Sequence, residues 1–154
     1  MINEIRILLI EDDYLQAKTI QSGLQERLRG EYPNLSFEVI STESEFYDRF
    51  EKIAQEGFRI IIIDVMLRWA SPSPDMPMPL PEVIEGGFFR AGLRCQQKLA
   101  LDARTSSIPT IIYTVLDESQ LPALPTGVKL VAKSGDLHSL AEEIRRTLRP
   151  LSQE

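Results

Sequence analysis

The sequence predicts an α/β protein whose core is one doubly wound parallel sheet. Segments with strand-like and helix-like patterns alternate along the 154 residues. The strand-like segments are continuous apolar runs without polar alternation, which is typical of strands covered on both faces. A parallel sheet with helices on both faces, joined by right-handed crossovers, satisfies both observations.

Five strands are expected, and the clearest contains the run Ile60–Ile63. Four consecutive isoleucines leave no polar face, so both sides of this strand are expected to be covered. The strands are predicted at residues 5–10, 36–41, 59–64, 108–114 and 128–132.

Helical patterns fill most of the connections between these strands. Thr42 followed three residues later by Glu45 is a capping box, and Asp136 can cap the last helix through its side-chain oxygen. The last helix also has one apolar face, formed by Leu137, Leu140, Ala141, Ile144 and Leu148. The helices are predicted at residues 14–29, 43–55, 87–103 and 136–148.

A proline-rich insertion at residues 68–85 interrupts the pattern after the third strand. Its prolines preclude a regular helix or an interior strand; they are Pro72, Pro74, Pro77, Pro79 and Pro81. The insertion is either a surface loop without chemistry of its own, or a lid or partner-reading loop, because it begins close to Asp64. Trp69, Met76 and Met78 are its candidates for apolar contacts.

A shorter irregular segment lies at residues 116–126, between the last two strands. Pro122 and Pro125 leave room there for at most a short helical turn. The helix that normally connects such strands is therefore expected to be shortened.

Composition predicts one globular domain over residues 1–154, with 43% hydrophobic and 26% charged residues. A formal net charge of -6 argues against direct binding to nucleic acid, because phosphate backbones favour clustered Lys and Arg. The single cysteine, Cys95, cannot form an internal disulfide and is expected to be structural. With no apolar stretch long enough for a signal peptide or a membrane span, a cytoplasmic protein is expected.

Acidic residues follow the first and third predicted strands. Glu11, Asp12 and Asp13 come directly after the first, and Asp64 ends the third. The carboxyl ends of parallel strands meet at one edge of a sheet, where ligands bind in open α/β folds. Clustered carboxylates repel each other, and Mg²⁺, which prefers oxygen ligands, relieves that repulsion. The sequence therefore predicts a Mg²⁺ site at this edge.

Thr114 and Lys133 end the fourth and fifth predicted strands. Asp64 could attack phosphorus and form an acyl phosphate, while the Lys133 ammonium and the Thr114 hydroxyl bind phosphoryl oxygens. Each residue alone is commonplace, and an acidic triplet is often only a solvated turn or a helix cap. Their joint placement at four strand ends indicates a phosphoryl-transfer site.

The sequence resembles the receiver domain of two-component response regulators along nearly its whole length. The matching segments are residues 7–13 (ILLIEDD), 61–67 (IIIDVML), 109–114 (PTIIYT) and 131–133 (VAK). The resemblance implies a flavodoxin-like fold with five parallel strands in the order 2-1-3-4-5. It also implies that Asp64 accepts a phosphoryl group from a histidine kinase or a histidine phosphotransfer protein.

By the same resemblance, Glu11, Asp12, Asp64 and the Met66 backbone carbonyl bind Mg²⁺, and Thr114 and Lys133 contact the phosphoryl group. The metal-binding pair of the family matches Glu11 and Asp12 rather than Asp13. Two positions depart from the usual pattern. Leu130 stands where many receivers carry the aromatic residue that reports phosphorylation, and Val115 stands where a smaller residue is common.

Three functions are considered. The first is a stand-alone receiver that is not an enzyme beyond its own phosphoryl transfer, and that signals to an unknown protein partner by changed docking. Under this hypothesis no further domain is expected after residue 148 and no membrane is expected as a partner, while the oligomeric state is left open. The second is a phosphorylation-independent interaction scaffold with the receiver fold. The third is a Mg²⁺-dependent phosphotransfer or phosphodiester-cleaving enzyme.

Overall fold

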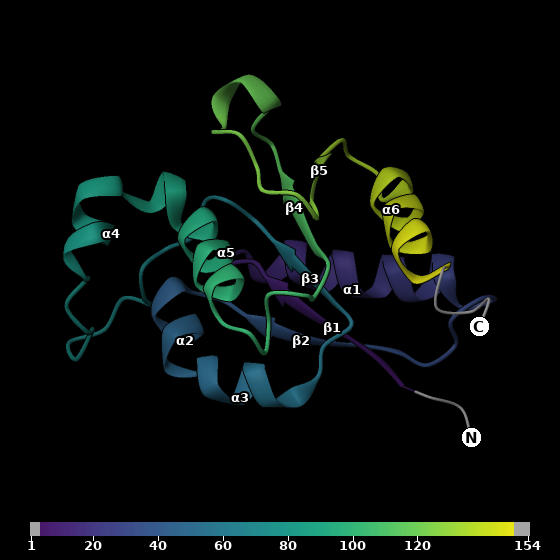
Figure 1. Cartoon of the computed structure of the whole chain (residues 1–154), viewed down its shortest axis with the longest axis horizontal. Helices are drawn as coiled ribbons and strands as arrows, with labels where there is room; N and C mark the ends of the chain where they lie inside the picture. The colour runs from purple at the N-terminus through teal and green to yellow at the C-terminus, as the bar shows by residue number, and fades with distance from the viewer. Residues whose placement is uncertain (1–3, 150–154) are drawn as a thin grey trace.

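A computed structural model describes residues 4–149 of the chain. Its centre is a sheet of five parallel strands in the order β2-β1-β3-β4-β5, with helices on both faces (Figure 1). This confirms the predicted doubly wound sheet and its 2-1-3-4-5 order. The strands are β1 (Ile5–Ile10), β2 (Leu35–Ile40), β3 (Ile60–Ile63), β4 (Thr110–Thr114) and β5 (Val128–Ala132).

The side chains of β3 alternate between two apolar clusters. Ile60 and Ile62 belong to the cluster that also contains buried residues of α1 and α6, whereas Ile61 and Ile63 belong to the cluster of α2, α3 and α5. All four isoleucines are buried, so both faces of this strand are covered as expected. The helices are α1 (Tyr14–Leu28), α2 (Glu43–Asp48), α3 (Phe50–Glu56), α5 (Ala91–Leu101) and α6 (His138–Leu148).

Side-chain caps begin two of these helices. Asp13 Oδ1 accepts a hydrogen bond from Gln16 N at 2.9 Å at the start of α1. At the start of α2, Thr42 Oγ1 accepts one from Glu45 N at 3.2 Å. The Glu45 carboxylate accepts a hydrogen bond from Ser41 N rather than from Thr42 N. Only one of the two hydrogen bonds of the predicted capping box is therefore formed, the one from Glu45 N to Thr42.

The predicted helix at residues 43–55 is wrong as one element. The backbone leaves helical geometry at Arg49 (φ -101°, ψ 7°), which separates α2 from α3. The last helix also begins later than predicted, at His138, although Asp136 Oδ1 accepts a hydrogen bond from His138 N at 2.8 Å. Asp136 therefore lies before the helix and accepts a hydrogen bond from its first residue.

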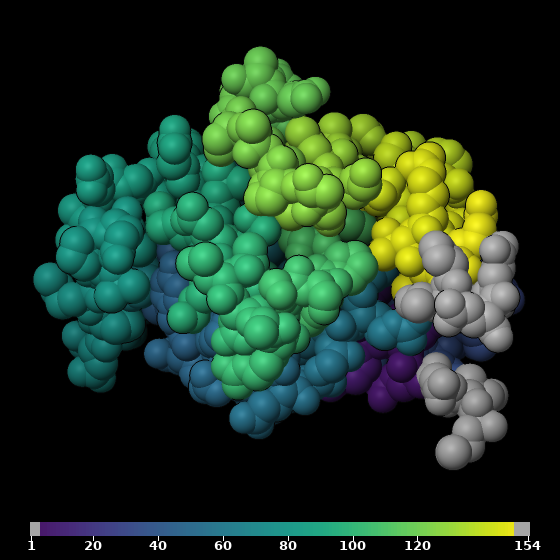
Figure 2. Space-filling view, in the orientation of Figure 1, coloured from purple at the N-terminus to yellow at the C-terminus, as the bar shows by residue number. Residues whose placement is uncertain are grey.

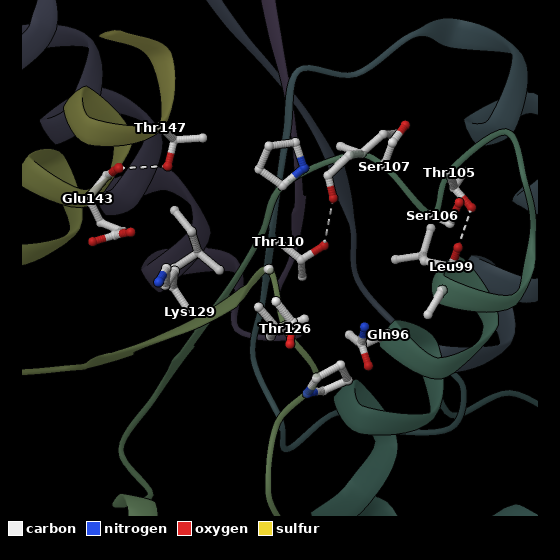
Figure 3. A pocket seen from close by; sticks show the side chains of 17 residues that line it. Gln96, Leu99, Thr105, Ser106, Ser107, Thr110, Thr126, Lys129, Glu143 and Thr147 are labelled. Atoms are coloured by element: carbon white, nitrogen blue, oxygen red, sulfur yellow. Dashed lines mark hydrogen bonds between the residues drawn. The ribbon is translucent and has the colours of Figure 1, made fainter. Parts of the chain in front are cut away.

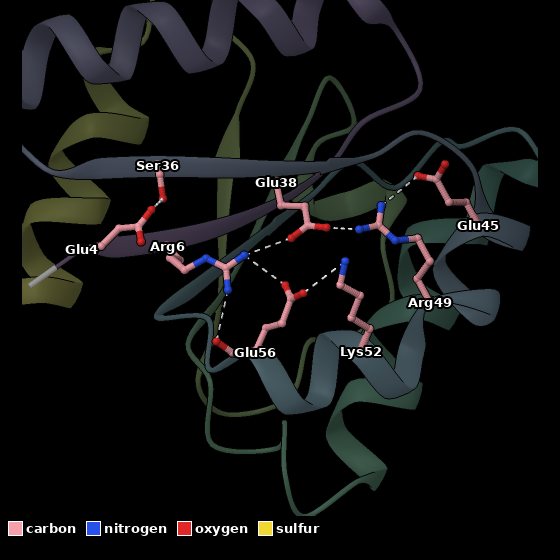
Figure 4. Close-up of polar contacts among 8 residues, drawn as sticks. All are labelled: Glu4, Arg6, Ser36, Glu38, Glu45, Arg49, Lys52 and Glu56. Atoms are coloured by element: carbon pink, nitrogen blue, oxygen red, sulfur yellow. Dashed lines mark hydrogen bonds and ion pairs between the residues drawn. The ribbon is translucent and has the colours of Figure 1, made fainter.

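Charged residues within β1 and β2 are paired with residues of the α2–α3 region (Figure 4). Arg6 Nη2 lies 3.1 Å from Glu38 Oε2 and 3.0 Å from Glu56 Oε2. Arg49 also contacts Glu38, and Lys52 contacts Glu56. Such partly exposed pairs contribute little to stability one by one, but they explain how charges are accommodated in otherwise apolar strands.

The insertion at residues 68–85 is not wholly irregular. Its end forms the short helix α4 (Pro81–Gly86), which corrects the expected loop, because proline at the first position of a helix loses no hydrogen bond there. The predicted helix at 87–103 is a 3₁₀ turn, η1 (Phe88–Arg90), followed by α5. Figure 2 shows the region around the insertion and α4 as a projection at one side of the molecule.

The segment between β4 and β5 contains only the 3₁₀ turn η2 (Glu118–Gln120), so the predicted shortening of this connection is confirmed. Cys95 is a residue of α5, and its side chain is buried in the apolar cluster that this helix shares with α2 and α3. Burial raises the pKa of its thiol well above the ordinary value. Among residues 4–149, the helices lack the combination of length and apolar character that crossing a membrane requires.

Candidate functional site

Backbone hydrogen bonds continue past the strand ends and fix the positions of the predicted site residues. Ile10 pairs with Ile63, so the residues that follow them, Glu11 and Asp64, are neighbours at the carboxyl edge of the sheet. Asp64 N donates to Ile10 O at 3.0 Å. At the other end of the site, Lys133 N donates to Thr114 O at 2.9 Å. The parallel topology thus brings together residues that are far apart in sequence.

The Lys133 ammonium lies between two buried carboxylates. Its Nζ atom is 2.8 Å from Asp64 Oδ2 and 2.9 Å from Glu11 Oε2. A third hydrogen bond, of 2.8 Å, joins it to Gln16 Oε1 on α1. The side chains of Lys133, Glu11 and Asp64 are 12%, 2% and 9% exposed, so one cation lies between two carboxyl groups that solvent barely reaches.

The electrostatics of the three groups follow from this burial. Burial raises the pKa of Glu11 to about 7; the Asp64 charge acts in the same direction, and the hydrogen bond from Lys133 opposes them. For Lys133, burial alone would lower the pKa of the ammonium, but the hydrogen bonds and charges of Asp64 and Glu11 outweigh it and raise the pKa. Lys133 is therefore a cation at neutral pH.

Asp12 is turned toward the start of the insertion. Its Oδ2 atom accepts a hydrogen bond from Arg68 N at 3.1 Å and lies 3.7 Å from Arg68 Nε. Within residues 4–149, no three acidic, histidine or cysteine side chains are grouped closely enough to form a ready metal site. The predicted convergence of three carboxylates is thus only partly present, because Glu11 and Asp64 face Lys133 while Asp12 faces Arg68.

The residues nevertheless fit a hard divalent cation in their chemistry. Glu11, Asp12 and Asp64 all supply carboxylate oxygens and line one cavity. Both contacts from Arg68 involve Oδ2 of Asp12, so they do not use its Oδ1 atom. Mg²⁺ commonly keeps several waters and takes only one or two carboxylates from the protein, so a pre-assembled trio is not required.

Met66 and Thr114 differ in their access to this cavity. Met66 lines it, and Met66 N donates to Asp64 Oδ1 at 3.3 Å. Thr114 lies at the end of β4 but is fully buried, and its Oγ1 atom accepts a hydrogen bond from Leu116 N at 3.4 Å. Val115, the next residue, is 64% exposed and lines the cavity.

The cavity has a volume of about 720 Å³ and is lined by two chemically different groups of residues. One group is the acidic residues and Lys133 at the sheet edge. The other is apolar residues of the insertion and the turn after it, namely Trp69, Ala70, Met76, Val83 and Phe88. Of the three predicted apolar contacts of the insertion, Trp69 and Met76 face this cavity, whereas Met78 is 82% exposed and does not line it.

Sequence reasoning missed Gly92 and Gln16. A Cβ atom on Gly92 would lie 2.0 Å from Asp64 O, and Gly92 N donates to Val65 O at 2.8 Å. Only glycine allows α5 to approach the backbone of Asp64 so closely. A glycine inside a predicted helix was the available signal for Gly92. Gln16 gave none, because its partner Lys133 is 117 residues away.

A second, smaller cavity of about 300 Å³ lies near the start of β4 and β5 (Figure 3). None of the predicted site residues lines it. Three of its four threonine hydroxyls donate to backbone carbonyls of the chain: Thr105 to Leu99 O, Thr110 to Ile108 O and Thr147 to Glu143 O. The cavity that contains Asp64 is therefore the better candidate for a functional site.

Comparison with known proteins supports the fold. No family model and no curated protein matches the chain. Among solved structures, a signal receiver domain of two-component signal transduction from Clostridium thermocellum is similar over 96% of this chain and 99% of its own, with a TM-score of 0.68 and 18% identity.

Two further structures are of interest. The phosphorylated cyanobacterial phytochrome response regulator RcpA covers 96% of this chain and 93% of its own, with a TM-score of 0.59 and 15% identity. The Mn²⁺-bound form of response regulator Rcp1 covers 94% and 91%, with a TM-score of 0.56 and 16% identity. At these identities the likeness concerns the fold, and it confirms that the chain has the CheY-like receiver fold.

Proposed function

We propose that this chain is a phosphoacceptor in phosphorelay signalling. Asp64 would accept a phosphoryl group from a phosphohistidine of a histidine kinase or phosphotransfer protein, with Mg²⁺ bound nearby, and the chain would signal through changed protein docking. The observation that carries this proposal is the Lys133 ammonium held between Glu11 and Asp64 at the carboxyl edge of a sheet with receiver topology. We place the receiver domain at residues 1–154, with 68–85 as an insertion within it.

In the proposed reaction, a carboxylate oxygen of Asp64 attacks phosphorus. The new bond joins that oxygen to phosphorus, and the bond between phosphorus and the donor nitrogen breaks, its electron pair leaving with the nitrogen. Lys133, already bonded to Asp64 Oδ2, would bind a phosphoryl oxygen of the product. Glu11, Asp12, Asp64 and the Met66 carbonyl would hold Mg²⁺, which neutralises charge on the phosphoryl oxygens.

Thr114 would donate a hydrogen bond to another phosphoryl oxygen. Thr114 Oγ1 accepts a hydrogen bond from Leu116 N, so its own hydrogen is still available to donate, but the residue is fully buried, and such a contact requires the segment 114–116 to move. A phosphoryl group adds nearly two negative charges, which is sufficient to bias a loop between two arrangements. This movement is how we expect phosphorylation to change the docking surface.

The solved neighbours supply the support for metal and phosphate. One of them is a phosphorylated response regulator, and another is a Mn²⁺-bound one. The oxygen ligands at the edge of this sheet are of the type that both Mn²⁺ and Mg²⁺ accept.

Intact-mass spectrometry tests the proposal. The protein is incubated with Mg²⁺ and phosphoramidate, and we expect one base-labile phosphate per chain. The adduct should be absent with Asp64→Asn and with excess chelator, while Asp75→Asn, a change in the exposed insertion, should leave it intact. An adduct of equal size on Asp64→Asn would overturn the assignment.

A scaffold function is the second candidate, and one observation favours it. Asp12 is engaged by Arg68 and the insertion lies over the acidic edge, an arrangement that would also suit a domain without phosphate control. Under this hypothesis, no adduct forms in the mass measurement, and binding of a protein partner is the same for the unmodified chain and for Asp64→Asn.

A further inference from the structure

The start of the insertion is fixed to the N-terminus of α2. Glu43 N donates to Arg68 O at 2.9 Å, and Ser44 N donates to Trp69 O at 2.7 Å. The indole Nε1 of Trp69 donates to Pro77 O at 2.8 Å, which ties the beginning of the insertion to its middle. The loop is therefore held by backbone hydrogen bonds that do not depend on the identity of most of its side chains.

The end of the insertion is fixed by a buried ion pair. Arg94 binds the Glu43 carboxylate through two hydrogen bonds of 2.7 Å each, and its Nη2 atom also donates to Gly87 O at 2.8 Å. Glu43 is fully buried and Arg94 is 13% exposed. Glu43 thus holds both ends of the insertion, one through its backbone and one through Arg94.

This double attachment gives the insertion a defined position beside Asp64. Met76, Val83 and Phe88 form an apolar wall of the same cavity that the acidic residues and Lys133 line. A ligand that suits both groups of residues has a doubly charged group and a flat ring whose face can pack on apolar side chains. A phosphoryl group attached to an imidazole ring has this form, whereas phosphoramidate has no ring.

We propose that the insertion is a donor-selecting element, whose apolar wall contacts the ring that carries the phosphoryl group and so favours phosphoimidazole-type donors. This inference rests on the proposed function of Asp64. In the transfer, the phosphorus–nitrogen bond breaks as the Asp64 oxygen bonds to phosphorus. Phosphoimidazole, protonated on its second ring nitrogen, leaves neutral imidazole, and phosphoramidate, protonated on nitrogen, leaves ammonia.

These two small donors form a matched pair, because they transfer the same group from nitrogen and differ in the ring. The initial rate of Asp64 phosphorylation is measured for each, and their ratio is taken for every variant. The difference in intrinsic reactivity between the two donors is the same for every variant, so it cancels when the ratios of two variants are compared. Met76→Ser is the test variant, because Met76 lines the cavity, and Met78→Ser is its control, because Met78 lies in the same insertion but outside the cavity.

We expect Met76→Ser to lower the ratio about three- to tenfold, the range for losing a partly exposed apolar contact of a few atoms. The phosphoramidate rate should stay within about twofold, and Met78→Ser should match the unchanged protein. Both methionines are exposed at the surface, so neither change threatens the fold.

The outcomes separate this inference from the proposed function. Phosphorylation by both donors with the same ratio in all three proteins overturns the donor-selecting role and leaves Asp64 as phosphoacceptor. A fall in the ratio that is equal for Met76→Ser and Met78→Ser also overturns it, since a cavity contact cannot explain the effect at 78. No Asp64 adduct from either donor overturns both.

Discussion

Lys133 is the residue on which the charge balance of the site depends. It bonds to Glu11 and Asp64, which lie side by side at the edge of the sheet and are almost completely buried. Two such carboxylates repel each other and lose hydration, so a cation between them compensates both costs. A phosphoryl group and a divalent cation would enter a site that is already organised by opposite charges.

Replacing Lys133 by alanine tests this balance. We expect Lys133→Ala to lower the free energy of unfolding by about 2 kcal/mol, because the buried carboxyl groups lose a charged hydrogen-bond donor. Mg²⁺ should stabilise the variant more than the unchanged protein, since Glu11 and Asp12 remain, and signalling should be lost. Thermal unfolding with and without Mg²⁺ measures this, and an identical Mg²⁺ effect in both proteins would count against the assigned role.

Gly92 controls the space next to Asp64, the proposed phosphoacceptor. A methyl group at this position would collide with the Asp64 carbonyl, which belongs to backbone and cannot move away cheaply. We expect Gly92→Ala to destabilise the protein by about 1–3 kcal/mol and to slow phosphorylation of Asp64.

Gly30→Ala is the matched control, because a Cβ atom there meets nothing within 4 Å. Urea unfolding and the rate of adduct formation should be nearly unchanged in this variant. If Gly92→Ala behaves like Gly30→Ala in both measurements, the close approach of α5 to Asp64 has no importance for the site.

At the scale of elements, α2 and α5 are joined by a polar cluster below the insertion. Tyr47 Oη donates to Glu43 Oε2 at 2.8 Å, beside the pair formed by Glu43 and Arg94. Burial raises the pKa of Tyr47 above its ordinary value of 10.0, and the hydrogen bond to Glu43 acts in the same direction. The folded protein therefore favours the protonated phenol.

This raised pKa predicts a pH dependence. The contribution of Tyr47 to stability is complete below pH 10, the unfolded pKa, and is lost as pH rises above it. Tyr47→Phe should cost about 2 kcal/mol at pH 7 through the lost hydrogen bond to a charged group. Above pH 10 the difference in unfolding free energy between the two proteins should shrink by up to about 1 kcal/mol per pH unit. Solvent screens the partly exposed phenol and keeps this slope below the value for a fully buried group.

Urea unfolding of both proteins between pH 7 and 11 measures the difference directly. Other groups that titrate in this range do so in both proteins and cancel. A difference that stays constant to pH 11 would show that the phenol of Tyr47 has no raised pKa in the folded state.

Elements were predictable where one local pattern decided them. The strand at Ile60–Ile63 followed from a continuous apolar run, and the last helix followed from the spacing of the apolar residues on one of its faces. The break at Arg49 did not, because it lies within a sequence that suits a helix throughout. The helix at Pro81–Gly86 was missed because the prolines before it indicated irregular backbone, and the helix-starting role of Pro81 was overlooked.

At the scale of the whole molecule, topology converts strand ends into a site. The parallel order of the strands places Glu11, Asp64 and Lys133 within hydrogen-bond distance, although 122 residues separate the first from the last. That meeting was predictable, because the side chains follow strands that must end at one edge. The contact between Asp12 and Arg68 was not, since it depends on the path of the insertion.

The insertion and the short connection at η2 give this receiver fold its own outline (Figure 1). Residues of the first line the cavity at the acidic edge, and the second leaves little helix between β4 and β5. At the surfaces that these two segments form, we expect the chain to differ from other proteins of the same fold in its choice of partner.

Chemical mapping of the phosphate tests the central claim most directly. The protein is phosphorylated in the presence of Mg²⁺, the acyl phosphate is reduced with borohydride, and the modified residue is located by peptide sequencing in a mass spectrometer. We expect reduction at position 64 alone, and none when the metal is chelated. Modification at any other residue, or an unmodified position 64 after incubation with a reactive donor, would contradict it.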